Sequence, residues 1–141
     1  MSNMIQNLNP VMAIDLRTAT REEMIDITAQ IRAAIRRSGV SDGICCVYCP
    51  HTTAGVTIQE NSDPDVKADM VGHIARVVPR TAPFRHGEGN SDAHIKSSLV
   101  GATTTVIVED GRPLLGHWQA IFFCEFDGPR ARSVRVKVIP G

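Results

Sequence analysis

The segment from Gly116 to Phe126 constrains the fold of this chain most, because it has the pattern of a strand that is apolar on both faces. Successive side chains of a strand point to opposite sides of the sheet. One face carries Trp118, Ala120, Phe122, Cys124 and Phe126, and the other carries His117, Gln119, Ile121, Phe123 and Glu125. Such a strand needs cover on both sides. We therefore expect Trp118 in the core, helices over one face, and either a mixed core or a homo-oligomer over the other.

The composition is that of an ordinary globular domain and argues against several classes of protein. Among the 141 residues, 15 Lys and Arg balance 15 Asp and Glu. A dedicated nucleic-acid or membrane-surface protein would need a basic face. No apolar run approaches the roughly 20 residues that span a bilayer, and the first ten residues lack the pattern of a secretory signal. We expect a cytoplasmic protein.

Cys46 and Cys49 have the C-x-x-C spacing of redox and zinc motifs. They lie in a predicted strand, however, where residues three apart point to opposite faces. We interpret them, together with Cys45 and Cys124, as reduced packing residues of a cytosolic protein.

Two long amphipathic segments predict the main helices. Thr20-Arg-Glu-Glu23 has the pattern of a capping box, and apolar residues follow it at helical spacing until Gly39. Asp63-Pro-Asp65 is typical of a second helix start, and its apolar stripe ends before Pro79. A short third helix is expected over 93–100.

The other segments are β-rich. Alternating patterns predict strands over 11–17, 44–49, 55–60, 103–109 and 133–139, and Asp110-Gly111 indicates a tight hairpin. Adjacent hairpins favour a mainly antiparallel sheet. The sequence therefore predicts an α+β fold in a single domain, residues 11–141, preceded by a loose arm over 1–10.

Three histidines lie in loops rich in polar residues. His51 opens the loop between two predicted strands, and His86 and His94 flank a glycine-rich loop. Neutral imidazole and carboxylate are ligands that zinc prefers, and a catalytic zinc keeps one position open. The alternative is that these histidines are exposed or hydrogen-bonded without a metal. His73 is expected to be a solvated helix residue.

The loop Gly87–Asp92 indicates an anion site as a further possibility. Its backbone N–H groups precede the short helix, whose positive dipole end favours phosphate, and Lys96 follows one turn later. The competing interpretation is a flexible glycine loop.

Several segments together have the pattern of a known family. They are His51-Thr-Thr-Ala-Gly-Val-Thr57, Glu60-Asn-Ser-Asp-Pro-Asp65, His86-Gly-Glu-Gly-Asn-Ser-Asp-Ala-His94, Asp110-Gly-Arg112, Gly116-His-Trp-Gln119 and Cys124-Glu-Phe-Asp-Gly-Pro-Arg130. In this combination, over residues 11–139, the chain resembles the YjbQ family, small proteins often named secondary thiamine-phosphate synthase. The family usually has Gly-Thr-Trp-Gln, whereas this chain has His117 in the Thr position.

The resemblance implies an α+β homotrimer with a weak thiamine-phosphate synthase activity. This reaction joins an aminopyrimidine methyl pyrophosphate to a thiazole phosphate and releases pyrophosphate, so it needs charge neutralisation and positioning of the thiazole nitrogen. We expect a small phosphorylated molecule or anion as the partner and a divalent metal ion, zinc or magnesium. We expect no organic cofactor, nucleic acid or membrane.

The site hypothesis assigns three kinds of residue. The expected catalytic residues are His51, Glu60, Asn90 and Gln119. Those expected to bind substrate or anion are Thr52, Asn61, Gly89, Asn90, Lys96, Ser98 and Trp118. Those expected to bind the metal ion are His51, His86 and His94, with Glu60 or Asp65 as an extra ligand or as a partner that orients a histidine.

Two other functions stay open for a chain with these residues. No nucleophile or tuned acid–base pair is recognisable, so a metal- or anion-binding protein without catalysis is the first alternative. The second is a metal-dependent hydrolase, in which an open metal position activates water.

Overall fold

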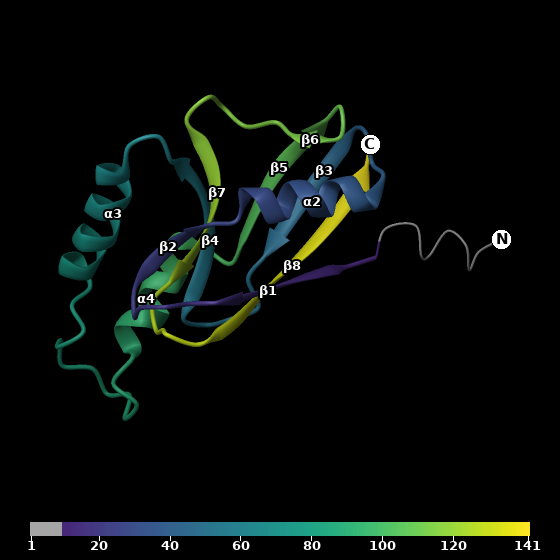
Figure 1. The fold of residues 1–141 in the computed structure, drawn as a ribbon. Helices are drawn as coiled ribbons and strands as arrows, with labels where there is room; N and C mark the ends of the chain where they lie inside the picture. The colour runs from purple at the N-terminus through teal and green to yellow at the C-terminus, as the bar shows by residue number, and fades with distance from the viewer. Residues whose placement is uncertain (1–9) are drawn as a thin grey trace.

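The computed structural model describes residues 10–141, which form three helices and eight strands (Figure 1). In chain order these are β1 (Met12–Arg17), β2 (Glu23–Asp26), α2 (Thr28–Ser38), β3 (Gly43–Tyr48), β4 (Ala54–Glu60), α3 (Pro64–Val77), α4 (Ser91–Val100), β5 (Thr103–Glu109), β6 (Arg112–Pro113), β7 (Gln119–Glu125) and β8 (Ala131–Pro140). The predicted α+β class is confirmed. The predicted arm over 1–10 lies outside the described residues, apart from Pro10.

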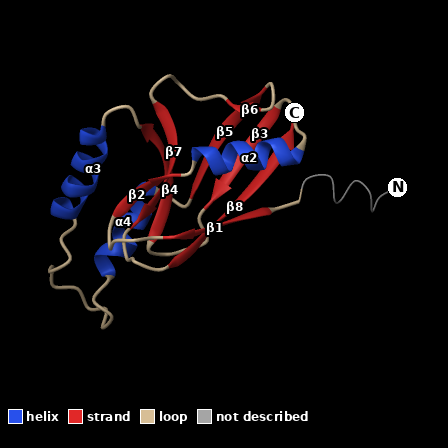
Figure 2. Cartoon of the chain, in the orientation of Figure 1, coloured by secondary structure: helices blue, strands red, loops and turns tan. Residues whose placement is uncertain are grey.

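The strands form two antiparallel sheets with the main core between them. The five-stranded sheet has the order β1-β8-β3-β5-β6, and the three-stranded sheet has the order β2-β7-β4. Val47 of β3 pairs with Val136 of β8, and both side chains are fully buried. Helix α2 crosses the five-stranded sheet (Figure 2) and buries Ile31 and Ile35 completely in the same core. The alternation of apolar residues therefore sets which face of each strand is inside.

Strand β7 is buried on both faces, as its sequence predicts. Ile121 and Phe123 join the core between the sheets, while Ala120, Phe122 and Cys124 form a second cluster beneath α3 and α4. A single chain thus covers both faces of β7, so the burial of β7 does not by itself require a second copy. The expectation that Trp118 is a core residue is wrong. Its side chain is 57% exposed, because the strand begins only at Gln119 and the indole lies beyond the sheet.

The first helix starts seven residues later than the capping-box pattern predicts, with Ile27 and not Thr20 at the N-cap. The side chain of Glu23 does accept from the backbone N–H of Thr20, with Oε2 at 2.7 Å from the nitrogen. The next residues, however, form β2, in which Met24 pairs with Cys124 of β7. Pairing with β7 buries Met24 in the second cluster, and this tertiary gain overrides the local helix signal. The predicted end at Gly39 is confirmed, with a left-handed φ of 71°.

Other local predictions agree with the structure. Asp63 caps α3 by accepting from the backbone N–H of Asp65 at 2.9 Å. Asp110 and Gly111 both have positive φ, 52° and 73°, as a two-residue hairpin of the Asp-Gly type requires.

All four cysteines are free. Within residues 10–141, no helix is long and apolar enough to cross a membrane.

Candidate functional site

A pocket of about 330 Å³ opens at the end of the three-stranded sheet where β4 begins and β7 ends. Three segments meet there: the loop before β4, the glycine-rich loop before α4, and the turn between β7 and β8. We call this the histidine pocket. Its lining residues are Pro50, His51, Thr52, Thr53, Glu88, Asn90, His94, Asp127, Arg130 and Arg132.

The histidine pocket collects part of the predicted site. His51, Thr52, Asn90 and His94 line it, although the loop before β4 supplies the first two and the start of α4 the others. The ring of His86 lies next to that of His94, with 5.8 Å between the ring centroids. His51 and His94 thus line one pocket, and His86 lies beside His94.

A second set of predicted residues lies at the other end of the same sheet. Asn61, Trp118 and Gln119 line a separate pocket, and Glu60 pairs with Gln119 in the register of β4 and β7. The register places Ala54 opposite Glu125 at the first pocket and Glu60 opposite Gln119 at the second. Six residue steps separate the two ends, or roughly 20 Å along a strand. One small molecule does not reach both pockets of one chain.

Lys96 does not fit the predicted anion-binding role. Its side chain is only 1% exposed, and its Nζ lies 2.7 Å from Oδ2 of Asp92 and contacts the carboxylate of Glu22. Asp92 in turn receives two hydrogen bonds of 3.1 Å from Arg21. Two carboxylates thus already neutralise the ammonium inside the protein. Ser98 is exposed and donates to the carbonyl of His94 in its own helix.

Arg130 provides an accessible positive charge in the histidine pocket. Its Nη2 donates to Oδ2 of Asp127 at 3.0 Å and its Nε to the carbonyl of Asp127 at 2.8 Å, while about half of the side chain stays exposed. Asn90 donates its Nδ2 to the same carboxylate oxygen at 2.8 Å. Its Oδ1 is buried and has no hydrogen-bond partner in the described part of the chain. The polar groups around Asp127 are therefore held in fixed positions.

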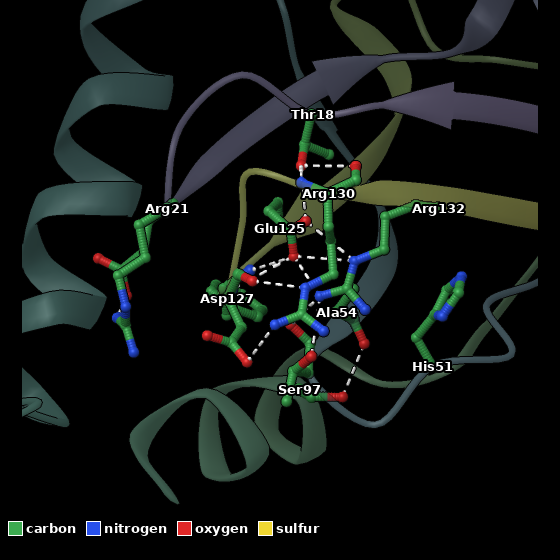
Figure 3. A network of polar contacts seen from close by, with 12 residues as sticks. Thr18, Arg21, His51, Ala54, Ser97, Glu125, Asp127, Arg130 and Arg132 are labelled. Carbon is green, nitrogen blue, oxygen red and sulfur yellow. Dashed lines mark hydrogen bonds and ion pairs between the residues drawn. The ribbon is translucent and has the colours of Figure 1, made fainter. Parts of the chain in front are cut away.

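Beneath these groups, a buried ion pair supports the pocket (Figure 3). Glu125 is fully buried and accepts from Nε of Arg132 at 2.9 Å and from Oγ1 of Thr18 at 2.7 Å. Nη2 of Arg132 also donates to Oγ1 of Thr53 at 2.8 Å. These bonds join β7, β8 and the loop before β4, and so they fix the segments that carry His51 and Arg130.

Asp127, Arg130, Arg132 and Glu125 were not among the predicted site residues, although three of them lie in the segment Cys124-Glu-Phe-Asp-Gly-Pro-Arg130. Two of them, Arg132 and Glu125, could have been found from the alternation of inward and outward residues along their strands. Arg132 stands on the same face of its strand as Val134 and Val136, and Glu125 stands on the same face as Ile121 and Phe123. A charged residue at an inward position needs a partner of opposite charge. The inward positions of Arg132 and Glu125 therefore predict that these two side chains form an ion pair.

His51 is held in its neutral form by its surroundings. Its Nε2 lies 3.0 Å from the backbone nitrogen and 3.1 Å from the carbonyl oxygen of Ser133. Burial, followed by the nearby positive charge of Arg132, lowers the pKa of the imidazole. The neutral ring can accept or donate a hydrogen bond, and it brings no positive charge to the pocket near neutral pH.

The three histidines do not form one metal-ligand set. Nε2 of His51 faces the backbone of Ser133, and the part of the chain that the structure describes has no group of three or more His, Cys, Asp or Glu placed to hold a metal ion. Asp65, the suggested extra ligand, lies in the first turn of α3, with its N–H bonded to Asp63. A zinc site with three protein ligands therefore does not fit this arrangement.

Residues 12–141 match the family model described as UPF0047 protein YjbQ-like. The chain belongs to the YjbQ family. It is similar to the UPF0047 protein YugU of Bacillus subtilis, with 52% identity over 89% of this chain and 96% of that protein. A UPF0047 protein of Methanocaldococcus jannaschii is 57% identical over 88% of this chain and 90% of that one.

Solved structures of YjbQ proteins share the fold. A crystal structure from Clostridium acetobutylicum, of the YjbQ/UPF0047 family, superposes with a TM-score of 0.89 at 50% identity, covering 91% of this chain and 99% of that one. A structure from Sulfolobus solfataricus also gives a TM-score of 0.89 at 28% identity, over 94% and 98% of the two chains. The architecture of the two sheets is thus a property of the family.

Proposed function

We propose that this YjbQ protein binds the phosphate groups of a small phosphorylated molecule in the histidine pocket. The observation that carries the proposal is Arg130, a half-exposed guanidinium fixed by Asp127 beside the first turn of α4. Guanidinium groups bind phosphate through paired hydrogen bonds, and a helix N-terminus adds favourable backbone N–H groups. Thr52 and His94 add side-chain donors along the same wall.

The reaction that we assign to this pocket is the thiamine-phosphate synthase reaction implied by the family resemblance. The carbon–oxygen bond to pyrophosphate breaks, a carbon–nitrogen bond to the thiazole nitrogen forms, and pyrophosphate leaves. Arg130 and the N-terminus of α4 neutralise the charge that develops on the leaving group. Oδ1 of Asn90, buried and unpartnered in the described residues, is positioned to accept from a donor of the substrate.

The donor set favours magnesium over zinc as the divalent ion. Mg²⁺ is commonly bound through one or two carboxylates together with substrate phosphates, and so it does not need three protein ligands. Glu88 and Asp127 supply carboxylates at the histidine pocket. When bound, the ion would neutralise negative charge on the pyrophosphate.

Replacing Arg130 by alanine is expected to lower turnover at least about tenfold, because a charge-assisted hydrogen bond to phosphate is lost. Product formation from the aminopyrimidine methyl pyrophosphate and the thiazole phosphate should be measured with Mg²⁺ at stoichiometric and substoichiometric protein. His94→Ala is the second variant. His73→Ala, in exposed α3 outside the pocket, is the matched control, and thermal melting checks that each variant folds.

Three outcomes are informative. Unchanged turnover in folded Arg130→Ala and His94→Ala protein would contradict the assignment of the pocket. If the parent chain forms no product but binds inorganic pyrophosphate, and Arg130→Ala loses that binding, the chain is a binding protein without catalysis. Tightly bound zinc in the untagged parent protein, found by elemental analysis, would overturn the preference for magnesium.

We also propose that the chain assembles as a homotrimer through the outer face of the five-stranded sheet. Ile44 of β3 pairs with Ile107 of β5 on one side and with Ile139 of β8 on the other. All three side chains are about half exposed and form a continuous apolar stripe across three strands. Contiguous apolar surface of this kind is typical of contacts between proteins.

Ile107→Lys is expected to reduce the mass in solution from about three times 15.3 kDa to that of one chain, because a charge would be buried at the contact. Light scattering coupled to gel filtration measures this mass. Arg37→Glu, on the exposed side of α2, is the control and should leave the mass unchanged. A parent protein of 15.3 kDa at high concentration would refute the assembly.

A further inference from the structure

A hollow of about 900 Å³ lies between the second half of α2 and the hairpin that joins β5 to β6 (Figure 1). The histidine pocket, at about 330 Å³, is smaller and shares no lining residue with it. We call this hollow the arginine cleft. Its lining residues are Arg32, Ile35, Arg36, Gly39, Val40, Ser41, Asp110, Gly111 and Arg112.

The two walls of the arginine cleft are tied to each other. The backbone N–H of Gly111, at the tip of the hairpin, donates to the carbonyl of Ser41 in the loop after α2 at 2.9 Å. Ile35 is completely buried and Val40 nearly so, and both anchor the end of α2 in the main core. The cleft is therefore formed before a ligand binds, and binding does not have to order its walls.

Three arginines from two elements line this cleft. Arg32 and Arg36 lie one turn apart on the same face of α2, with roughly 5–6 Å between their β-carbons, and Arg112 belongs to the hairpin. All three residues are exposed, and none has a hydrogen bond or ion pair with another residue among 10–141. Because like charges repel, an anion bound between them relieves a repulsion as well as adding an attraction.

Two features of the cleft carry negative charge and reduce its positive charge. Asp110 lines the cleft from the hairpin, and α2 ends there with a carbonyl end equivalent to about half a negative charge. The carbonyls of Ile35 and Arg36 already accept from Oγ of Ser38 and from the N–H of Gly39. Three guanidinium groups still leave the cleft with about one and a half positive charges, so it favours an anion.

The spacing of the arginines favours a chain of linked anionic groups over a single group. Guanidinium groups bind phosphate through paired hydrogen bonds. A single phosphate satisfies one guanidinium and leaves the other charges unpaired. Linked phosphates can instead follow α2 from Arg32 to Arg36 and also reach Arg112 on the opposite wall.

We propose that the arginine cleft binds a chain of three or more linked phosphates, the group that nucleoside triphosphates and inorganic polyphosphates share. This inference goes beyond the function proposed for the histidine pocket. The two sites have no residue in common, and the substrates of the reaction assigned to the histidine pocket carry at most two linked phosphates. The arginine cleft is therefore a second site with a ligand of higher charge.

Isothermal titration calorimetry of the full chain with tripolyphosphate measures this binding. The buffer contains EDTA, so that no divalent ion neutralises the phosphate chain. We expect saturable binding that is at least about tenfold tighter than that of pyrophosphate and that weakens as the salt concentration rises. ATP distinguishes the two sources of the chain. Binding of ATP at least as tight as that of tripolyphosphate assigns the cleft to nucleoside triphosphates, and weaker binding assigns it to inorganic polyphosphate.

Arg36→Gln and Arg37→Gln form a matched pair of variants. Each removes one positive charge from the last turn of α2, but only Arg36 lines the cleft. Arg36→Gln, like Arg112→Gln, should weaken tripolyphosphate binding at least about tenfold, because a charge-assisted hydrogen bond is lost. Arg37→Gln should change the affinity by less than about twofold, since its charge is exposed and screened.

Asp110→Asn tests the charge of the cleft in the opposite direction. Asp110 has a positive φ of 52°, which asparagine tolerates, and Asn-Gly is a favoured sequence for this type of hairpin turn. The variant therefore keeps the hairpin and removes the only carboxylate side chain among the lining residues. Tripolyphosphate binding should become about threefold tighter or more, because a like charge no longer repels the ligand.

Three results would overturn the inference. The first is the absence of saturable binding up to about 10 mM tripolyphosphate, far above the range of typical metabolite sites, or pyrophosphate that binds as tightly. The second is equal weakening by Arg36→Gln and Arg37→Gln, or folded Arg36→Gln and Arg112→Gln proteins that bind like the parent. The third is binding that Arg130→Ala removes and Arg36→Gln keeps. That result would place tripolyphosphate in the histidine pocket and leave the function proposed there intact.

Discussion

Replacing Glu125 by alanine is expected to lower the free energy of unfolding by about 3–5 kcal/mol, the usual cost of breaking a buried ion pair from one side. Glu125 is fully buried, and the guanidinium of Arg132 is nearly so. Without the carboxylate, Arg132 keeps its bonds to Thr53 but has a buried charge without a counter-ion. The hydroxyl of Thr18 and the backbone N–H groups of Phe126 and Asp127 also lose their hydrogen bonds to this carboxylate.

Urea unfolding followed by circular dichroism measures this loss. Glu109→Ala, at an exposed position of β5, is the control and should change stability by less than about 0.5 kcal/mol. The double variant Glu125→Ala with Arg132→Met removes both charges and should recover part of the loss, because the uncompensated charge is then absent. Equal stability of Glu125→Ala and the parent protein would show that this pair does not hold β7 and β8 together.

The second large effect is a loss of stability in acid that depends on Asp92. Burial raises the pKa of this carboxyl, but hydrogen bonds from Arg21 and Lys96 outweigh burial and lower the pKa from 3.8 to about 2. A carboxyl whose pKa is lower in the folded protein stabilises the fold above its unfolded pKa, and that contribution is lost as the pH falls toward the folded pKa. The contribution is about 2 kcal/mol and disappears between roughly pH 5 and pH 2.

The readout is the difference in unfolding free energy between the parent protein and Asp92→Asn, because other carboxyls titrate in the same range. At pH 7 the variant should be less stable by at least about 2 kcal/mol, since it also leaves the buried Lys96 with a single carboxylate partner. The difference should shrink steadily below about pH 4. A difference that stays constant from pH 7 to pH 3 would refute the role assigned to Asp92.

Helix caps, tight turns and the inward faces of strands were predicted correctly, because a few neighbouring residues determine each of them. The Asp63 cap and the left-handed Gly39 and Gly111 are set by backbone geometry within one turn. The predicted burial of β7 on both faces is also confirmed, because side chains alternate along any strand. The start of α2 was predicted wrongly, since pairing between Met24 and Cys124 joins residues 100 positions apart.

The candidate site was predictable only in part for the same reason. The histidines and Asn90 were recognisable as polar residues in loops, but their meeting point depends on how three loops close around the end of β4 and β7. The sequence also could not show that Lys96 is neutralised by Glu22 and Asp92, or that Trp118 projects beyond the sheet. These outcomes depend on partners that are distant in the chain.

By itself, the sequence determined the family, the α+β class, the face of each strand that turns inward, and several caps and turns, because each follows from residue type and short-range spacing. Only the tertiary structure decided that the predicted site residues divide between two ends of one sheet, and that Glu125 and Arg132 support the pocket from beneath. The register of β4 against β7 sets this division, and a register is a relation between segments that no single segment contains.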